Sequence, residues 1–380
     1  MIYFDNGATT FPKPPAVRRA VMNALQNVGA NPGRSGHRMA QRAGEIIYEC
    51  RKNTARLLGV PSPENVIFTY NCTTALNTVI HGLLRKGDHA VISCLEHNAV
   101  VRPLEELKSQ GISFTAVDFV YGDDDKTLDN FRAAIRANTR LVVCTAASNV
   151  FGVRLPVERL AAMCRIYNIP FCVDAAQTAG CVPVNMEESG IDFLCCAGHK
   201  GLYGPMGTGI LALNGKVLPR SLTQGGTGSF SSDPMQPEIL PDKYESGTPN
   251  LPGIAGLNEG VRFVLSKGVD RIFAEETRKA QRLYDLLSAN PRVRLYTERP
   301  SAATHVPVVS FNIEGRDSEE TAAALNDSFN IAVRAGLHCA PLAHRFFGTE
   351  QQGTVRAVMS VFTTPAQIEY LAAAVKRISG

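Results

Sequence analysis

Six apolar runs decide the fold of this chain: VIFTY (66–70), AVISC (90–94), SFTAVDF (113–119), LVVCTAA (141–147), PFCVD (170–174) and DFLCCA (192–197). Near-continuous apolar runs of this length are typical of strands that are buried on both faces of a sheet. Helical patterns lie between them, at 101–110, 128–137 and 156–167. This alternation predicts an α/β fold with a mostly parallel sheet flanked by helices, in which ligands bind at the carboxyl ends of the strands.

The sequence changes character after this region. A stretch rich in Gly, Ser and Pro covers 224–252, and it is long for a loop in a compact domain. The segments beyond it predict a smaller C-terminal α/β domain, with strands at 308–313 and 355–362 and helices at 253–267, 270–289, 318–329 and 365–378. A further helix is expected at 15–27. We expect a large domain over 14–255, and a second unit made of the N-terminal arm 1–13 and 256–380.

Composition limits the classes of protein that the chain can belong to. The 380 residues are 44% hydrophobic and 19% charged, which is the balance of a globular protein rather than a disordered one. The net charge of +4 is small and spread along the chain, so no nucleic-acid partner is expected. No apolar stretch is long enough for a membrane span, and the start MIYFDN lacks the features of a secretory signal. Ten cysteines without regular spacing favour a reducing compartment, so a cytoplasmic location is expected.

A lysine follows the last of the six runs, in AGHKGLYGPMGTG (197–209). Lys200 is expected at the mouth of a buried sheet, where partial desolvation lowers the pKa of an amine and allows it to react with an aldehyde. The alternative is an ordinary surface lysine. An aspartate, Asp174, ends the preceding run in VDAAQTAG (173–180). The alternative interpretation of Asp174 is that it caps a helix.

Lys200 and Asp174 together match the needs of pyridoxal 5'-phosphate (PLP), which takes a lysine on its aldehyde and a carboxylate on its ring nitrogen. The segment NCTTALN (71–77) follows a strand and opens a helix, so its backbone N–H groups, with Thr73 and Thr74, could hold a phosphate. His97, just past another strand, could stack on the cofactor ring, or it could simply be bonded within its loop.

On these residues the chain resembles the cysteine desulfurase and selenocysteine lyase family, which are class V, fold-type-I PLP enzymes. Seven motifs carry the resemblance in order along nearly the whole chain: YFDNGATT (3–10), EHN (96–98), SNVFG (148–152), VDAAQ (173–177), GHK (198–200), ESGTPN (245–250) and VRAGLHCA (333–340). The resemblance implies a mostly parallel seven-stranded sheet in the large domain, and a homodimer with shared active sites.

The resemblance also implies roles for individual residues. Lys200 matches the lysine that binds PLP covalently, and Arg356 matches the arginine that grips the substrate carboxylate. Thr248 matches a phosphate ligand from the neighbouring subunit. In one departure Ala197 stands where the family usually has Ser, so one phosphate hydroxyl is missing. The remaining matches are the ring partners Asp174, Gln177 and His97, the phosphate ligands Thr74 and His199, and Asn149 near cofactor and substrate.

A cysteine in RAGLHCAPLAH (334–344) stands in a more polar setting than the others. Cys339 matches the family's persulfide-forming cysteine, and Arg334 nearby would favour the thiolate that acts as the nucleophile. A zinc site made of His338, Cys339 and His344 with Cys195 or Cys196 is an alternative, but it lacks paired ligand spacing, so no metal is expected. His37 either lines the entrance to the site or begins a helix.

The expected activity is conversion of L-cysteine to L-alanine, with the sulfur transferred to Cys339 as a persulfide and then to an acceptor protein or small thiol. Lys200 and His97 are the candidate proton carriers. Selenocysteine lyase action on L-selenocysteine and transamination of a small amino acid are the alternatives within the family. A scaffold protein without catalysis is the alternative outside it, and it would need neither Lys200 nor Asp174.

Overall fold

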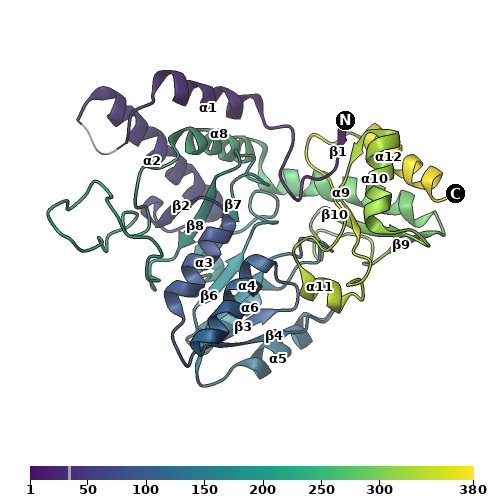
Figure 1. Cartoon of the computed structure of the whole chain (residues 1–380), viewed down its shortest axis with the longest axis horizontal. Coiled ribbons are helices and arrows are strands. Elements are labelled where there is room, and N and C mark those ends of the chain that lie inside the picture. The colour runs from purple at the N-terminus through teal and green to yellow at the C-terminus, as the bar shows by residue number, and fades with distance from the viewer. Residues whose placement is uncertain (33–35) are drawn as a thin grey trace.

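The computed structural model describes residues 1–32 and 36–380 and is built around a seven-stranded sheet (Figure 1). The strand order is β2-β8-β7-β6-β5-β3-β4. Only β8 runs against its neighbours, because it pairs antiparallel with both β2 and β7. The predicted mostly parallel sheet is therefore confirmed. Its strands are β2 (Val66–Thr69), β3 (His89–Ser93), β4 (Ser113–Val117), β5 (Thr139–Thr145), β6 (Phe171–Asp174), β7 (Phe193–Ala197) and β8 (Gly209–Leu213).

Both faces of this sheet are buried, which explains why its strands read as continuous apolar runs. Along β5, Leu141 and Val143 point to the face covered by α3 (Cys72–Leu83) and α4 (Asn98–Leu107), and Val142 and Cys144 point to the other. Side chains of a strand alternate between faces, so two cores require apolar residues at every position. The second face is covered by α2 (Arg38–Leu58), α5 (Asp124–Ala134), α6 (Val157–Ile166) and α8 (Leu251–Lys267).

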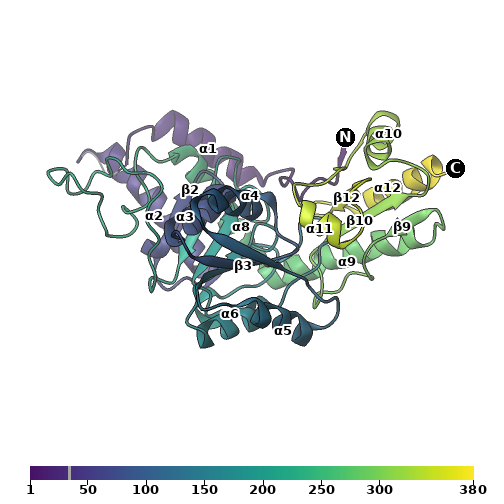
Figure 2. The ribbon, with the colours of Figure 1, turned by 60° about the horizontal axis from the view of Figure 1, so that its bottom comes forward.

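The smaller C-terminal part is a separate layer of helices on an antiparallel sheet (Figure 2). Its strand order is β12-β10-β9, and Phe311 of the central strand lies in its own core with Leu283 and Leu371. The elements are α9 (Val269–Ser288), β9 (Val293–Leu295), β10 (Val308–Ile313), α10 (Ser318–Phe329), α11 (Pro341–Phe346), β12 (Val355–Val358) and α12 (Pro365–Ile378). The predicted second α/β unit is confirmed, although β12 ends four residues before the predicted strand does.

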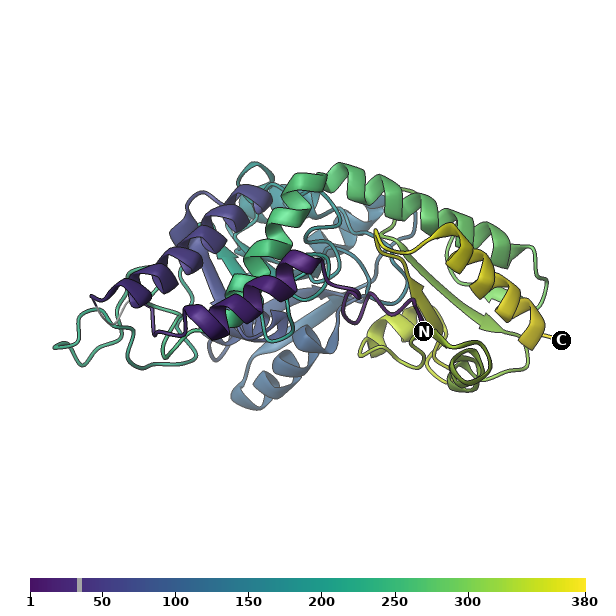
Figure 3. The ribbon, with the colours of Figure 1, turned by 90° about the horizontal axis from the view of Figure 1, so that it is seen from above.

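The N-terminal arm crosses between the two parts of the molecule (Figure 3). Its strand β1 (Ile2–Tyr3) pairs parallel with β11 (Ile331–Ala332), and α1 (Pro15–Asn27) packs on α8. The helix α8 runs through residue 255, so the proposed boundary between 255 and 256 falls within a continuous helix. The division into 14–255 and the remainder stays a proposal.

The elements of the large unit that the sequence analysis did not predict include the helix α2 and the strand β8. The helix α2 is amphipathic, and much of its outer surface is polar. The strand β8 follows β7 through a glycine-rich turn without a helix between them, so it departs from the alternation on which the prediction rested. In the described parts of the chain we find no helix with the length and apolar character that crossing a membrane requires.

Candidate active site

The candidate residues gather where β3, β5, β6 and β7 end. Asp174 is the last residue of β6, Lys200 lies in the turn after β7, and His97 begins α4 after β3. Their charges interact, because both Asp174 and Lys200 affect the pKa of His97. The carboxyl edge of the sheet thus brings together the three residues that the sequence placed after separate strands.

Asp174 is held in a turn and does not cap a helix. Its side chain is 4% exposed, and its Oδ1 accepts a hydrogen bond from the backbone N–H of Ala176 at 2.9 Å. The thiol of Cys72, the first residue of α3, donates to the same oxygen at 3.5 Å. No helix begins in the segment directly after β6, so the helix-cap alternative is wrong for this residue.

Lys200 is a half-buried amine whose pKa is lowered, chiefly by burial and further by the positive charge of Arg356. Asp174 opposes that shift. A lowered pKa increases the fraction of amine that is unprotonated and able to attack an aldehyde. The environment of Lys200 therefore differs from that of an ordinary surface lysine.

His97 combines a local bond with a free ring nitrogen. Its Nδ1 accepts a hydrogen bond from the N–H of Ala99 at 3.0 Å, as an N-cap of α4. A nitrogen that accepts carries no proton, so the neutral ring is protonated on Nε2. The pKa of His97 is lowered, mainly by burial, which favours that neutral form. The loop-bonded alternative is thus correct for Nδ1 and leaves Nε2 available.

The start of α3 has the features of an anion site. Asn71, not a threonine, caps the helix, and its Oδ1 accepts bonds from the N–H of Thr74 at 2.8 Å and the hydroxyl of Thr74 at 3.1 Å. Thr73 is exposed in the first turn. The ring nitrogen Nδ1 of His199 is buried and has no hydrogen-bond partner in the part of the chain that the structure describes. A helix N-terminus beside hydroxyl groups and an unpaired ring nitrogen is suited to binding a phosphate. Together with Lys200 and Asp174, this set of groups fits PLP.

Arg356 is the most buried cation of the site. It is 1% exposed, its Nη1 donates to the carbonyl oxygen of Asn149 at 2.7 Å, and its Nη2 is 3.0 Å from Oδ1 of Asp5. Its Nε and the side-chain oxygen of Asn149 are buried and find no partner among residues 1–32 and 36–380. Burial lowers the pKa of Arg356 while Asp5 raises it. The unfilled donor indicates capacity for a further acceptor, such as a carboxylate.

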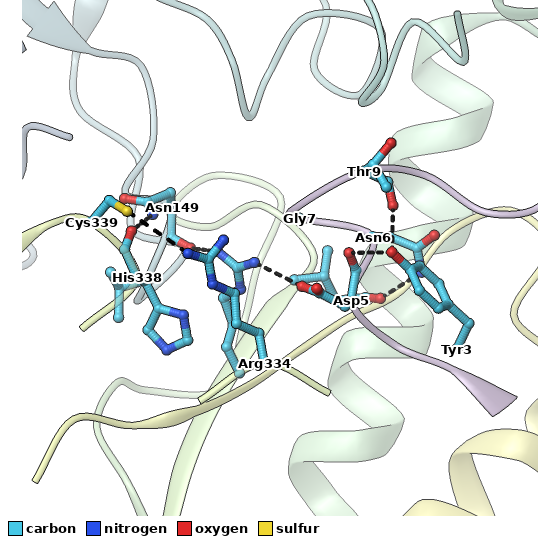
Figure 4. Close-up of polar contacts among 12 residues, drawn as sticks. Tyr3, Asp5, Asn6, Gly7, Thr9, Asn149, Arg334, His338 and Cys339 are labelled. Atoms are coloured by element: carbon cyan, nitrogen blue, oxygen red, sulfur yellow. Dashed lines mark hydrogen bonds and ion pairs between the residues drawn. The ribbon is translucent and has the colours of Figure 1, made fainter. Parts of the chain in front are cut away.

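Cys339 is the one exposed cysteine of the ten, all of which lie in the described residues. Nη2 of Arg334 lies 3.8 Å from its Sγ, so a positive charge stands beside the exposed thiol. The carbonyl oxygens of Cys339 and His338 accept bonds from the N–H of Asn98 at 2.7 Å and the amide of Asn149 at 2.8 Å. Figure 4 shows Cys339, His338 and Asn149 together on one side of Arg334.

The backbone around this cysteine is strained. His338 and Cys339 have φ values of 47° and 58°, in the left-handed region that non-glycine residues avoid. The ring of His338 is hydrogen-bonded through Nε2 to the carbonyl oxygen of Thr354 at 2.9 Å, and it stacks on His344. These contacts hold the loop in a conformation that costs on the order of 1 to 3 kcal/mol per residue.

Two predicted residues lie apart from this cluster. His37 is exposed and caps α2 by accepting from the N–H of Ala40 at 3.3 Å, so its helix-start interpretation is the one that the contacts support. Thr248 is exposed and accepts from the side-chain amide of Asn31 at 3.3 Å. Thr248 lines a cavity of about 570 Å³ together with Thr74 of the same chain.

The N-terminal arm supplies site residues to which the sequence analysis gave no role. Gln177, a predicted ring partner, donates from Nε2 to the carbonyl oxygen of Gly7 at 3.1 Å, and Asp5 pairs with Arg356. Both arm residues belong to the YFDNGATT motif, which carried the resemblance but suggested no contact. Only the folded chain brings the arm to these positions, since 351 positions separate Asp5 from Arg356.

The zinc alternative has no geometric support. Cys195 and Cys196 lie in the core of the sheet, and His344 is fully buried and bonded to Thr349 at 2.7 Å. Within residues 1–32 and 36–380 no group of three or more His, Cys, Asp or Glu side chains is arranged to hold a metal ion.

Comparison with known proteins identifies the family. The family described as aminotransferase class-V matches residues 2–371. A probable cysteine desulfurase of Mycolicibacterium paratuberculosis is 33% identical over 100% of this chain, which spans only 55% of that relative, and one of Methanothermobacter thermautotrophicus is 31% identical over 100% of this chain and 95% of its own length.

Solved structures agree with this match. The apo structure of a cysteine desulfurase from Thermococcus onnurineus has a TM-score of 0.90 at 32% identity and covers 100% of this chain and 94% of its own. The cysteine desulfurase CsdA of Escherichia coli, in its S-sulfonic acid form, has a TM-score of 0.87 at 26% identity and covers 99% and 94%. The chain therefore belongs to the aminotransferase class-V family, the PLP-dependent family that includes the cysteine desulfurases.

Proposed function

We propose that this chain is a PLP-dependent cysteine desulfurase, which converts L-cysteine to L-alanine and carries the sulfur on Cys339 as a persulfide. The observation that supports the proposal most directly is the pairing of one exposed thiol with Arg334 at the sheet edge that also holds Lys200 and Asp174. A thiol that is buried could not reach a substrate or an acceptor, and the other nine are buried.

The residues that would hold the cofactor have separate tasks. Lys200 would carry it covalently, Asp174 would keep its ring nitrogen protonated, and Gln177 and His97 would contact its ring. When bound, PLP supplies an electron sink for the bond changes at the amino acid. The phosphate would lie at the start of α3, held by Thr73, Thr74 and His199 together with backbone N–H groups of the first turn, while Ala197 offers it no hydroxyl.

The substrate carboxylate would bind Arg356, whose Nε is unfilled, with Asn149 and Arg334 at the same point. Such an arrangement orients the Cα–H bond toward Lys200 or His97. Either group is a suitable proton acceptor, because burial lowers the pKa of both. The same group then returns a proton to the β-carbon as alanine forms.

Cys339 would act as the nucleophile on the substrate sulfur. Its thiolate forms a sulfur–sulfur bond while the Cβ–S bond of the substrate breaks, and the electron pair of that bond remains with the β-carbon and is protonated. No outside oxidant is required, because the carbon is reduced as the sulfur is oxidised. The guanidinium of Arg334 lies beside the sulfur that takes part in this step.

A second copy of the chain would complete the site. Thr248 is exposed near the end of the irregular stretch 224–252, and it lines the same cavity as Tyr70 and Gly207. Tyr70 and Met206, which precedes Gly207, are large side chains that are each 72% exposed. Large apolar side chains in water indicate a surface that another protein covers. We propose a homodimer in which Thr248 of one subunit reaches the phosphate of the other, located in the cytoplasm, with a sulfur-acceptor protein as a further partner.

The test is to incubate the purified protein with PLP and L-cysteine, to measure alanine and pyruvate, and to locate the persulfide by mass spectrometry. Cys339→Ala should abolish persulfide and sulfide output while a borohydride-trapped cofactor remains on Lys200. Cys164→Ala, at a buried position, is the matched control. Full cysteine turnover by Cys339→Ala would remove this residue from the mechanism. In place of alanine, 3-mercaptopyruvate would indicate transamination, and pyruvate with ammonia would indicate β-elimination.

A further inference from the structure

The arm from Tyr3 to Lys13 touches both halves of the candidate site. On the side of the small domain, the side-chain amide of Asn6 donates to the carbonyl oxygen of Val358 at 2.9 Å. The backbone N–H of Val358 in turn donates to the carbonyl oxygen of Phe4 at 2.7 Å. On the side of the large domain, Gly7 accepts from Gln177. One short segment therefore connects Arg356's strand with the cofactor side of the site.

At the small-domain end, Asp5 fixes the guanidinium of Arg356. The Asp5 side chain is 22% exposed and that of Arg356 only 1%, so the 3.0 Å pair is largely shielded from water. Of the five N–H groups of the guanidinium, the contact to Asp5 uses one on Nη2 and the contact to Asn149 uses one on Nη1, while Nε has no partner among the described residues. Figure 4 shows Asp5 reaching from the arm toward Arg334 and Cys339.

At the large-domain end, several donors converge on the carbonyl oxygen of His199, directly before Lys200. Nζ of Lys13 lies 2.6 Å from it, the hydroxyls of Thr9 and Thr10 lie at 3.1 and 3.2 Å, and the N–H of Thr10 lies at 3.2 Å. The hydroxyl of Thr10 also donates to the carbonyl oxygen of Lys200 at 3.0 Å.

Lys13 is unusual among the lysines of the described residues. It is half-buried without an ion pair in the described residues, and its Nζ hydrogen-bonds to the hydroxyl of Thr10 at 2.7 Å and to the His199 carbonyl oxygen. Burial lowers its pKa to about 7. Burying an amine costs free energy, and the hydrogen bonds to Thr10 and the His199 carbonyl oxygen offset part of that cost.

We propose that the N-terminal arm is the positioning element of this active site, with Asp5 setting the orientation of Arg356 and Lys13 fixing the turn that carries Lys200. The inference rests on the proposed function. A single small amino acid must reach Arg356 with its carboxylate and Lys200 with its α-carbon, and these two atoms of the substrate are one bond apart. The two protein groups come from different domains, so a strap that is bonded to both keeps their separation constant.

The small-domain end is tested with Asp5→Asn, which keeps the shape but removes the charge, and with Asp5→Ala. Both should raise KM for L-cysteine, by about tenfold for Asp5→Ala, with a smaller change in kcat. In the protein without cofactor, phenylglyoxal should modify Arg356 at least about fivefold faster than in the parent protein, as measured by mass spectrometry. The control is Asp129→Asn, which removes an exposed pair with Arg132 and should change neither measurement.

The large-domain end is tested with Lys13→Met. Hydrogen exchange of the amides in 198–204, measured without cofactor, should accelerate at least about fivefold, and PLP affinity should fall. Lys13→Arg, which keeps a donor, should restore most of both properties.

Unchanged KM and unchanged Arg356 reactivity in both Asp5 variants would overturn the inference at that end. Normal exchange and PLP affinity in Lys13→Met would overturn it at the other. If the parent protein fails to desulfurate cysteine, the proposed function fails, but the reactivity and exchange measurements still decide the role of the arm. A variant that unfolds in circular dichroism is replaced by its conservative partner, Asp5→Asn or Lys13→Arg.

Discussion

The buried ion pair between Arg51 and Glu245 offers the clearest test of how this structure is held together. The side chains are 7% and 14% exposed, and the guanidinium meets both carboxylate oxygens. Glu245 also accepts from the N–H of Phe68 at 2.6 Å, and Arg51 lies 4.6 Å above the centre of the Phe68 ring. The pair ties α2 and β2 to the loop that carries Thr248.

Removing one partner of such a pair leaves an unpaired buried charge, which costs about 3 to 5 kcal/mol. For Glu245→Ala we expect the low end, about 3 kcal/mol, because Arg51 keeps its bond to the carbonyl oxygen of Val66 and part of the carboxylate is exposed. Glu245→Gln should cost about 2 kcal/mol, since its amide group places a donor against a donor of Arg51 while the remaining oxygen still accepts from Phe68.

The measurement is urea unfolding of the protein without cofactor. The chain has no tryptophan, so the signal is far-ultraviolet circular dichroism. The matched control is Glu350→Ala, which removes a pair with Arg345 whose side chains are 45% and 67% exposed and should cost less than about 0.5 kcal/mol. A loss below about 1 kcal/mol for Glu245→Ala would refute the reasoning that this pair is desolvated.

Three further outcomes are expected. Burial raises the pKa of Glu96 to about 8, so the contribution of its neutral carboxyl to stability is full at acid pH and falls as the pH rises toward that value. In urea unfolding, Glu96→Gln should therefore gain stability relative to the parent protein between about pH 5.5 and about pH 8.5. A difference that stays constant over this range would contradict a neutral carboxyl. Gly180→Ala should destabilise the protein by at least about 2 kcal/mol more than Gly122→Ala. Both glycines have a left-handed φ (80° and 74°), but of the two only Gly180 would place a Cβ against a backbone oxygen, that of Gly201, at 2.3 Å. Equal shifts in melting temperature would exclude that clash. His338→Ala should slow alkylation of Cys339 by iodoacetamide several-fold, because the loop can then leave its strained conformation and the thiol loses its contact with Arg334. His338→Asn should give an intermediate rate. Faster alkylation would show that the ring of His338 does not hold the thiol in place.

Much of the fold could be predicted because each local pattern agrees with its environment. The strand Val308–Ile313 and the helices Ser318–Phe329 and Pro365–Ile378 have the predicted bounds. A buried strand is recognised by its apolar run, and an amphipathic helix by its periodicity and its capping residue. The strand Gly209–Leu213 could not be predicted in the same way, because no helix separates it from its neighbour and its direction depends on pairing with residues far along the chain.

The sequence by itself determined that Lys200, Asp174 and His97 follow buried strands, and parallel strands end at one edge, so their meeting is a consequence of local order. It also placed Cys339 in a polar segment. Only the tertiary structure decided that Asp5 meets Arg356 and that Arg334 faces the one exposed thiol. The first contact joins segments that are 351 positions apart, which only the folded chain brings together. The second depends on how the chain turns between Arg334 and Cys339, where His338 and Cys339 take left-handed φ values that non-glycine residues seldom adopt and that local sequence does not predict.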